Sequence, residues 1–155
     1  MSVLKYKNRG ISIPGKIPNI YFCSNNSDFN LYFETISRDI LEQCNCTIWY
    51  RTDYDSDYDD AFFFELSQMQ LFVIPVTTSF LCSPNSVLHT EFSFALQTHI
   101  PLLPLLQESA LSDLFYQKCG SLQYLNPITQ APGDYIEKLG KYINGILYND
   151  TLSQR

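Results

Sequence analysis

The chain of 155 residues carries a formal net charge of −6, and 45% of its residues are apolar, including 11 Phe and 11 Tyr. This length and composition predict one globular domain with a full hydrophobic core. A nucleic acid partner is not expected, since a phosphate-tracking face needs clustered Lys and Arg. Four of the ten basic residues lie within the first 17 positions, so the rest of the chain is more acidic than the net charge suggests.

The sequence shows neither a membrane segment nor an export signal. No stretch reaches the roughly 18 consecutive apolar residues of a membrane-spanning helix, and the amino terminus has no signal-peptide apolar region. The odd number and irregular spacing of the cysteines fit reduced thiols in a reducing compartment. These cysteines are Cys23, Cys44, Cys46, Cys82 and Cys119. We therefore expect a cytoplasmic protein without membrane attachment.

Residues 1–17 are expected to be a lead-in to a domain that spans residues 18–148. Within this domain, residues 20–23 form a short apolar strand, and residues 24–27 form a polar turn. Asp28 is a suitable N-cap for the amphipathic helix that follows. The turn between these two elements is the first loop expected to face a ligand.

A second strand over residues 47–50 leads into an acidic loop over residues 51–60. The next helix is expected to begin at Asp59 or Asp60. A carboxylate at that point satisfies free backbone amides and complements the helix dipole.

The central part of the chain carries the main functional expectation. An apolar run over residues 71–76 is a third strand, followed by a polar loop over 77–84, a helix over 87–97 and a fourth strand over 100–106. In an open α/β sheet, ligands bind at the carboxyl ends of the strands. Glu91 lies on the helix that the polar loop introduces, so its carboxylate is expected beside a pocket.

The last part of the chain contains a short helix over residues 109–119 ended by Gly120, a fifth strand over residues 122–125, and a helix opened by Asp134. Five strand–helix repeats predict an α/β, flavodoxin-like three-layer fold, with helices on both faces of a five-stranded parallel sheet. Residues 149–155 are expected to be a C-terminal tail, leading to a further domain if the chain is one module of a longer protein.

Two metal-site patterns are present only in part. The pair Cys44 and Cys46 lacks the second pair of a zinc site, although a histidine could complete one. The alternating Asp residues of the 51–60 loop fail the EF-hand pattern, because Tyr58 occupies the Gly position and Phe64 occupies the closing Glu position. A solvated loop that caps the following helix is favoured, and no metal is expected.

Other signatures of nucleotide binding and hydrolysis are absent from the sequence. It has no Gly-rich phosphate loop, no nucleophile elbow and no H-E-x-x-H motif. A phosphoacceptor receiver domain has the same order of elements but needs acidic residues after the first and third strands. Ser24-Asn25 and Thr77-Thr78 occupy those positions, so the receiver class is excluded.

Several short motifs, taken in order, resemble the Toll/interleukin-1 receptor (TIR) domain. They are residues 20–24 with Asp28, residues 70–74, Thr77 with Phe80, Leu81, Ser83 and Pro84, Glu91-Phe92, and residues 100–105. These segments are similar to the family's first strand and the Asp after it, its third strand and Ser-containing loop, its helical Glu with the next apolar residue, and its fourth strand. The resemblance covers about residues 18–148.

The resemblance implies an activity. Many bacterial, plant and some animal TIR domains cleave NAD+, and the Glu of a W-x-x-x-E motif is their catalytic residue. A carboxylate beside the ribose can stabilise the oxocarbenium-like ribosyl cation that forms when nicotinamide leaves. The implied activity is therefore that of an NAD+ nucleosidase, giving nicotinamide and linear or cyclic ADP-ribose, in bacterial anti-phage immunity.

The resemblance also implies site residues and partners. Glu91 takes the catalytic role, and the residues expected to contact NAD+ are Cys23, Ser24, Asn25, Tyr58 and Val87. NAD+ is a substrate, and no separate cofactor is implied. TIR enzymes complete their site with a neighbouring protomer, so a homo-oligomer is expected, with the acidic 51–60 loop at its contact.

The chain departs from the family pattern at three positions. Val87 replaces the Trp of the W-x-x-x-E motif, Arg51 replaces an Asp at the end of the second strand, and Ser56 replaces a Gly in the next loop. Two other functions stay open: a non-catalytic TIR module that signals by self-association, and an enzyme of similar fold such as a nucleoside deoxyribosyltransferase. The alternative role for Glu91 itself is an ordinary solvent-exposed helix carboxylate.

Overall fold

The computed structural model describes residues 4–10, 17–55, 58–128 and 130–153. Its sheet has five strands in the order β1-β3-β2-β4-β5. The strands are β1 (Leu4–Lys7), β2 (Asn19–Phe22), β3 (Thr47–Arg51), β4 (Leu71–Val76) and β5 (Leu102–Leu106). Strands β3, β2, β4 and β5 are parallel, and β1 pairs antiparallel with β3 at one edge.

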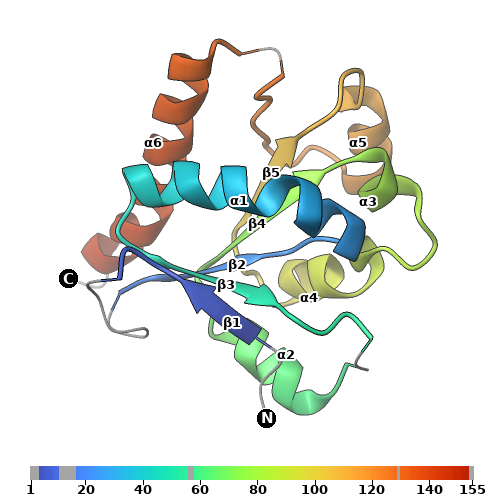
Figure 1. Cartoon of the computed structure of the whole chain (residues 1–155), viewed down its shortest axis with the longest axis horizontal. Helices are drawn as coiled ribbons and strands as arrows, with labels where there is room; N and C mark the ends of the chain where they lie inside the picture. Colours follow the sequence, from blue (N-terminus) through green and yellow to red (C-terminus); the bar gives the residue numbers. More distant parts are fainter. Residues whose placement is uncertain (1–3, 11–16, 56–57, 129, 154–155) are drawn as a thin grey trace.

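Helices cover both faces of this sheet (Figure 1). Helices α1 (Asn26–Gln43) and α6 (Pro132–Ser153) pack on one face. The other face is covered by α2 (Asp60–Ser67), α3 (Thr78–Cys82), the 3₁₀ turn η1 (Val87–His89), α4 (Glu91–Gln97) and α5 (Ser112–Cys119). The predicted flavodoxin-like three-layer α/β fold is confirmed. No helix within the described ranges is long and apolar enough to cross a membrane.

The two-residue period of the strands divides the core between the faces. On β2, Ile20 and Phe22 pack toward α1, whereas Tyr21 points to the opposite face with Phe72 of β4. Strand β4 is buried along its whole length. A continuous apolar run is typical of a parallel strand that helices cover on both sides.

The edge strands differ from the predicted ones. Within the predicted lead-in, Leu4 is buried opposite Arg51, and the Tyr6 ring packs on Trp49 at 5.1 Å between centroids. This strand is short and carries two Lys, as edge strands often do. The predicted fifth strand over 122–125 contributes only a bridge between Leu125 and Leu105, and Pro127, just beyond it, cannot donate to an extension of the ladder.

Up to Gln97, helix boundaries differ from the predicted ones at three places. Helix α1 begins after Asn25, so the prediction of Asp28 as N-cap is wrong by three residues. The predicted polar loop over 77–84 contains α3, which the Thr77 hydroxyl caps at Phe80 N. The predicted helix over 87–97 is split at Thr90, whose φ of −122° and ψ of −83° interrupt the helical path.

Two further helix ends agree with the sequence prediction, whereas the start of α5 at Ser112 and both ends of α6 differ from it. Helix α2 has Asp59 as its N-cap, accepting from Phe62 N at 2.8 Å. Gly120 ends α5 with φ of 74°, a conformation that costs Gly little. Helix α6 starts at Pro132, two residues before Asp134, and continues to Ser153 through most of the predicted tail.

Candidate functional site

The segments that follow β2, β3 and β4 meet at the carboxyl edge of the sheet and line an open cavity of about 440 Å³. Its lining consists of Asn25, Asn26, Ser27, Arg51, Tyr54, Asp55, Tyr58, Ser79, Ser83, Asn85 and Val87. Strands β3 and β4 lie on opposite sides of β2, so the connections from β2 and β3 run in different directions. Ligands of open α/β sheets bind at such a switch point.

Glu91, at the first position of α4, is completely buried behind this cavity. Its Oε1 accepts a hydrogen bond from the Tyr21 hydroxyl at 2.5 Å. Its Oε2 accepts from the Tyr58 hydroxyl at 2.6 Å and pairs with Arg51 Nη1 at 3.2 Å. The alternative role of a solvent-exposed helix carboxylate is therefore wrong: the split of the predicted helix at Thr90 directs α4 inward.

Burial controls the ionisation of this cluster. Complete desolvation raises the pKa of Glu91, although hydrogen bonds from Tyr21 and Tyr58 and the charge of Arg51 act in the lowering direction. Burial, followed by the charge of Glu91, raises the pKa of Tyr58 and Tyr21 well above the usual value. The two hydroxyls thus stay protonated and act as donors to the carboxylate.

Arg51 connects the buried carboxylate to the cavity. Its side chain is 6% exposed, yet the residue forms part of the cavity wall. The guanidinium carbon lies 4.7 Å from the ring centroid of Tyr58, 5.2 Å from that of Tyr54 and 5.4 Å from that of Phe62. Nε donates to Asp53 O at 3.0 Å. These cation–π contacts hold the guanidinium among aromatic rings.

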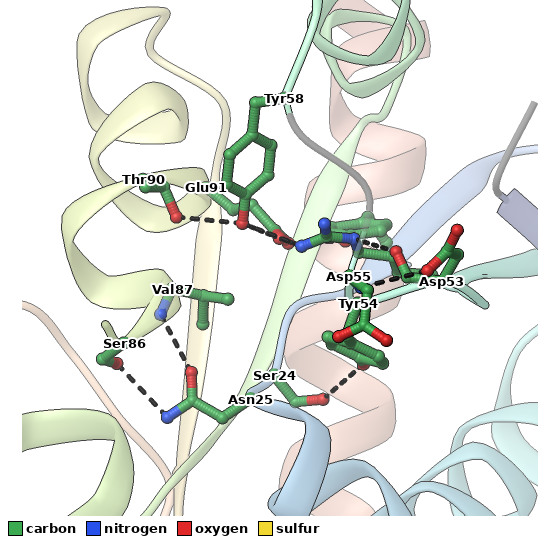
Figure 2. Close-up of polar contacts among 12 residues, drawn as sticks. Ser24, Asn25, Asp53, Tyr54, Asp55, Tyr58, Ser86, Val87, Thr90 and Glu91 are labelled. Atoms are coloured by element: carbon green, nitrogen blue, oxygen red, sulfur yellow. Dashed lines mark hydrogen bonds and ion pairs between the residues drawn. The ribbon is translucent and has the colours of Figure 1, made fainter. Parts of the chain in front are cut away.

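The Tyr58 hydroxyl is a junction in this network. It donates to Glu91 and accepts from Arg51 Nη1 at 3.0 Å and from Thr90 Oγ1 at 3.1 Å. In Figure 2 the dashed line from Thr90 ends on the Tyr58 hydroxyl, which in turn contacts Glu91. Three elements, β3, the loop before α2 and the start of α4, therefore meet at one oxygen atom.

Asn25 joins the loops on the two sides of the switch point. Its Oδ1 accepts from Val87 N at 2.9 Å, and its Nδ2 donates to Ser86 Oγ at 3.4 Å (Figure 2). Nδ2 also donates to Ser79 Oγ at 3.1 Å. Ser86 in turn donates to Phe80 O at 2.6 Å. The amide thereby fixes the wall of the cavity before any ligand enters.

The structure brings most of the predicted site residues together. Asn25, Tyr58 and Val87 line the cavity. Ser24 is buried beside it, with its hydroxyl 3.4 Å from the Tyr54 hydroxyl. Cys23 is fully buried in the hydrophobic core and is not part of the lining. Glu91 is also outside the lining because Arg51 and Tyr58 stand between it and the cavity.

The sequence prediction missed the roles of Arg51 and Tyr21. Arg51 entered only as a departure from the family pattern, and Ser56, another departure, lies outside the described residues. One signal was available for Arg51: a basic residue at the carboxyl end of a strand, immediately before a strongly acidic loop. The strand period also places Tyr21 on the face that α4 covers.

The described residues contain no group of three or more His, Cys, Asp and Glu side chains placed to hold a metal ion. Cys44 and Cys46 are buried free thiols. Asp57, one of the alternating acids of the loop, lies outside the described residues. The chemistry available in the described site is that of a desolvated carboxylate, one guanidinium, tyrosine hydroxyls and small polar side chains.

Comparison of the chain with protein-family models, curated proteins and solved structures finds no match. The geometry of the site and the resemblance of its motifs are therefore the grounds on which a function can be assigned. A cavity of this size is within the range of roughly 300–1,000 Å³ that small-molecule sites occupy.

Proposed function

We propose that this chain cleaves the bond between nicotinamide and ribose in NAD+, with Glu91 as the catalytic carboxylate. The observation that carries the proposal is a desolvated glutamate directly behind a polar cavity at the switch point of the sheet. Carboxylates with environmentally perturbed pKa values in a cleft are good candidates for catalytic groups.

The chemistry needs a group that stabilises positive charge on the ribose. When the bond from C1′ to the nicotinamide nitrogen breaks, its electron pair stays with nicotinamide, which leaves as a neutral molecule. The ribosyl group becomes cationic, and Glu91 stabilises it best in a site with little water. Water then adds to C1′ and releases a proton, giving ADP-ribose; attack by the adenine of the same molecule gives a cyclic product instead.

The residues of the cavity divide the remaining tasks. Asn25 stands on the β2 side of the cavity, where it can bind hydroxyl groups of the ribose, and Ser24 lies buried beside it. Tyr54 and Tyr58 offer aromatic faces for a flat ring, a contact typical of tyrosine at binding sites. Val87 supplies an apolar wall in place of the family's Trp. Before Glu91 can contact the ribose, Tyr58 and Arg51 must release its carboxylate and bind other groups.

The wider setting follows from the resemblance and is part of the same proposal. The enzyme is of the TIR type, acts in the cytoplasm in bacterial immunity, and works as a homo-oligomer. The acidic 51–60 loop forms part of the contact between protomers, because this loop borders the cavity through Arg51, Tyr54, Asp55 and Tyr58.

The activity is tested by incubating concentrated protein with NAD+ and separating the products by chromatography. We expect nicotinamide to appear in equal amount to ADP-ribose or a cyclic isomer. The same protein incubated with a 2′-deoxynucleoside should release no free base, which separates this activity from deoxyribosyl transfer. Intact NAD+ after long incubation at high protein concentration would contradict the proposal.

One observation favours a second candidate, a non-catalytic module that acts by self-association. Glu91 already has an ionic partner and two hydroxyl donors, and a saturated buried carboxylate can serve the fold alone. Exposed Phe64 on α2 offers apolar surface for contact, with 67% of its area accessible. This candidate predicts concentration-dependent assembly that Phe64→Ser disrupts, with no consumption of NAD+.

A further inference from the structure

We propose that Arg51 recognises the diphosphate of a nucleotide in the cavity, and that in doing so it releases Glu91. The inference deepens the proposed function and rests on it for the second part, the release for catalysis. The first part, recognition of a nucleoside diphosphate, can be tested without any turnover.

The charge distribution around the cavity points to Arg51. The chain carries a net charge of −6, so an anionic ligand needs a local positive charge to bind. Among the described residues that line the cavity, Arg51 is the single cation and Asp55 the single acid, while the others are neutral. An anion that enters this cavity meets Arg51 as its attractive partner.

A diphosphate can replace Glu91 as the hydrogen-bond partner of Arg51. The contact between these two residues joins one nitrogen, Nη1, to one oxygen, Oε2, at 3.2 Å, which is longer than a strong charge-assisted hydrogen bond. A diphosphate carries more charge and can accept two parallel hydrogen bonds from a guanidinium, the arrangement in which Arg binds phosphate most strongly. The rings of Tyr54 and Phe62 can keep their cation–π contacts while the guanidinium turns toward the cavity.

Arg51 and Glu91 each meet an opposite charge when NAD+ is the ligand. Its diphosphate takes the guanidinium, and its cationic nicotinamide riboside supplies the positive charge that Glu91 has lost. Glu91 keeps the hydrogen bond from Tyr21, which holds the carboxylate in place. A substrate without phosphate cannot offer an opposite charge to both Arg51 and Glu91. Arg51 therefore acts as a specificity-determining and positioning residue that makes Glu91 available only to a nucleotide.

Binding of ADP and adenosine, measured by calorimetry, tests the recognition. The double variant Arg51→Met/Glu91→Gln removes the cation without leaving a buried unpaired charge, so it is expected to fold, whereas Arg51→Met alone leaves Glu91 unpaired. The single variant Glu91→Gln is its matched control, because it retains Arg51 and removes the competing carboxylate.

The proposal predicts three differences in this binding measurement. The wild type binds ADP at least about tenfold more tightly than adenosine. Glu91→Gln binds ADP about threefold or more tightly than the wild type, since the carboxylate no longer competes for Arg51. The double variant loses the preference for ADP over adenosine. Equal affinities for ADP and adenosine in the wild type, unchanged or weaker ADP binding by Glu91→Gln, or full ADP affinity in the double variant would each overturn it.

Two further variants check that the effect is local. Asp55→Asn removes the one acid of the described lining and should strengthen ADP binding about two- to fivefold, because a like charge near the ligand is lost. Asp60→Asn makes the same change at the start of α2, outside the cavity lining, and should alter the affinity much less. Equal effects of the two substitutions would mean that the overall charge of the protein, and not this cavity, governs binding.

Cleavage by the wild type tests the release of Glu91. We expect kcat/KM for NAD+ to exceed that for nicotinamide riboside by about a hundredfold or more, with part of the difference in kcat, because the phosphate contact also frees the carboxylate. Equal cleavage of both substrates would overturn the release. If neither substrate is cleaved, the proposed function and the release fail together, and the binding measurement still decides whether Arg51 recognises the diphosphate.

Discussion

The Tyr58 hydroxyl shows how a single polar atom can set the state of the site. It donates to Glu91, accepts from Arg51 and Thr90, and is attached to a ring that also packs on the guanidinium. Loss of this oxygen leaves three buried or half-buried polar groups with fewer partners, whereas the aromatic packing stays.

Tyr58→Phe should therefore lower the free energy of unfolding by about 1–3 kcal/mol, the usual cost of leaving a buried hydrogen-bonding group unsatisfied. Urea denaturation measures this change. Tyr54→Phe is the matched control, because within the described part of the chain the Tyr54 hydroxyl makes only a 3.4 Å contact with Ser24, so its loss should cost less. A larger effect at Tyr54 than at Tyr58 would argue against the network as described.

The raised pKa of Glu91 gives a second prediction at the residue scale. The groups that face this carboxylate are Tyr21, Cys23, Tyr58 and Arg51. Burial favours the protonated acid in the folded state, so the folded protein binds the proton more tightly than the unfolded chain does. The contribution to stability is then fully present below the ordinary pKa of 4.5 and is lost as the pH rises through the raised folded value.

The measurement compares the wild type with Glu91→Gln, whose side chain does not titrate. The free energy of unfolding of the wild type, relative to that of the variant, should fall as the pH rises above about 4.5. Asp28, another buried acid with a raised pKa, is present in both proteins, so its titration cancels in the difference. A relative stability that increases with pH would mean that pairing with Arg51 outweighs burial.

The sequence predicted part of this residue-scale picture. The resemblance to the TIR family implied Asn25, Tyr58 and Val87 as site residues, and all three line one cavity. The pairing of Arg51 with Glu91 joins residues 40 positions apart. It depends on the direction in which α4 enters the core, and the local pattern of the chain contains no information on that direction.

At the scale of elements, the start of α2 positions the loop that carries Tyr58. Asp59 caps this helix at Phe62 N, and Phe62 packs on both Tyr58 and Arg51. Asp59→Ala should reduce the free energy of unfolding by about 1 kcal/mol. Asp60→Ala removes a neighbouring carboxylate that is not the cap, so it should cost less; equal losses in thermal or urea unfolding would contradict the capping role.

Elements with strong local signals were predicted and weaker ones were not. The apolar runs of β4 and β5 and the Asp59 cap are visible in the sequence alone. Strand β1 has four residues, two of them Lys, and it is stabilised by pairing with β3 and by contact of Tyr6 with Trp49. The 122–125 segment has strand composition but only one residue bridged to β5. In both cases the neighbouring strand decides the outcome.

At the scale of the whole molecule, alternating strand and helix patterns were enough to predict three layers, because a sheet with two apolar faces must be covered on both.

Charge is the property of the whole molecule that bears on the proposed assembly. The net charge is −6, and Asp53, Asp55, Asp59 and Asp60 are exposed on the loop proposed for the contact between protomers. Like charges at close range oppose association and are screened by salt.

Specific activity toward NAD+ should therefore rise with protein concentration, and moderate added salt should shift this rise to lower concentration. Light scattering on the same samples would show whether larger particles accompany the activity. Asp53→Asn/Asp55→Asn should reduce the salt dependence by removing part of the repulsion. Activity per molecule that is constant from dilute to concentrated solution would contradict assembly as a requirement.

The most direct test of the central claim is the rate of nicotinamide release from NAD+ by the wild type and by Glu91→Gln, with folding of both confirmed by near-ultraviolet circular dichroism. If Glu91 stabilises the ribosyl cation, loss of its charge should slow the reaction by about a hundredfold or more. Rates within about threefold of each other in two folded proteins, a difference under 1 kcal/mol in barrier, would show that Glu91 is a structural carboxylate and that the proposed catalysis is wrong.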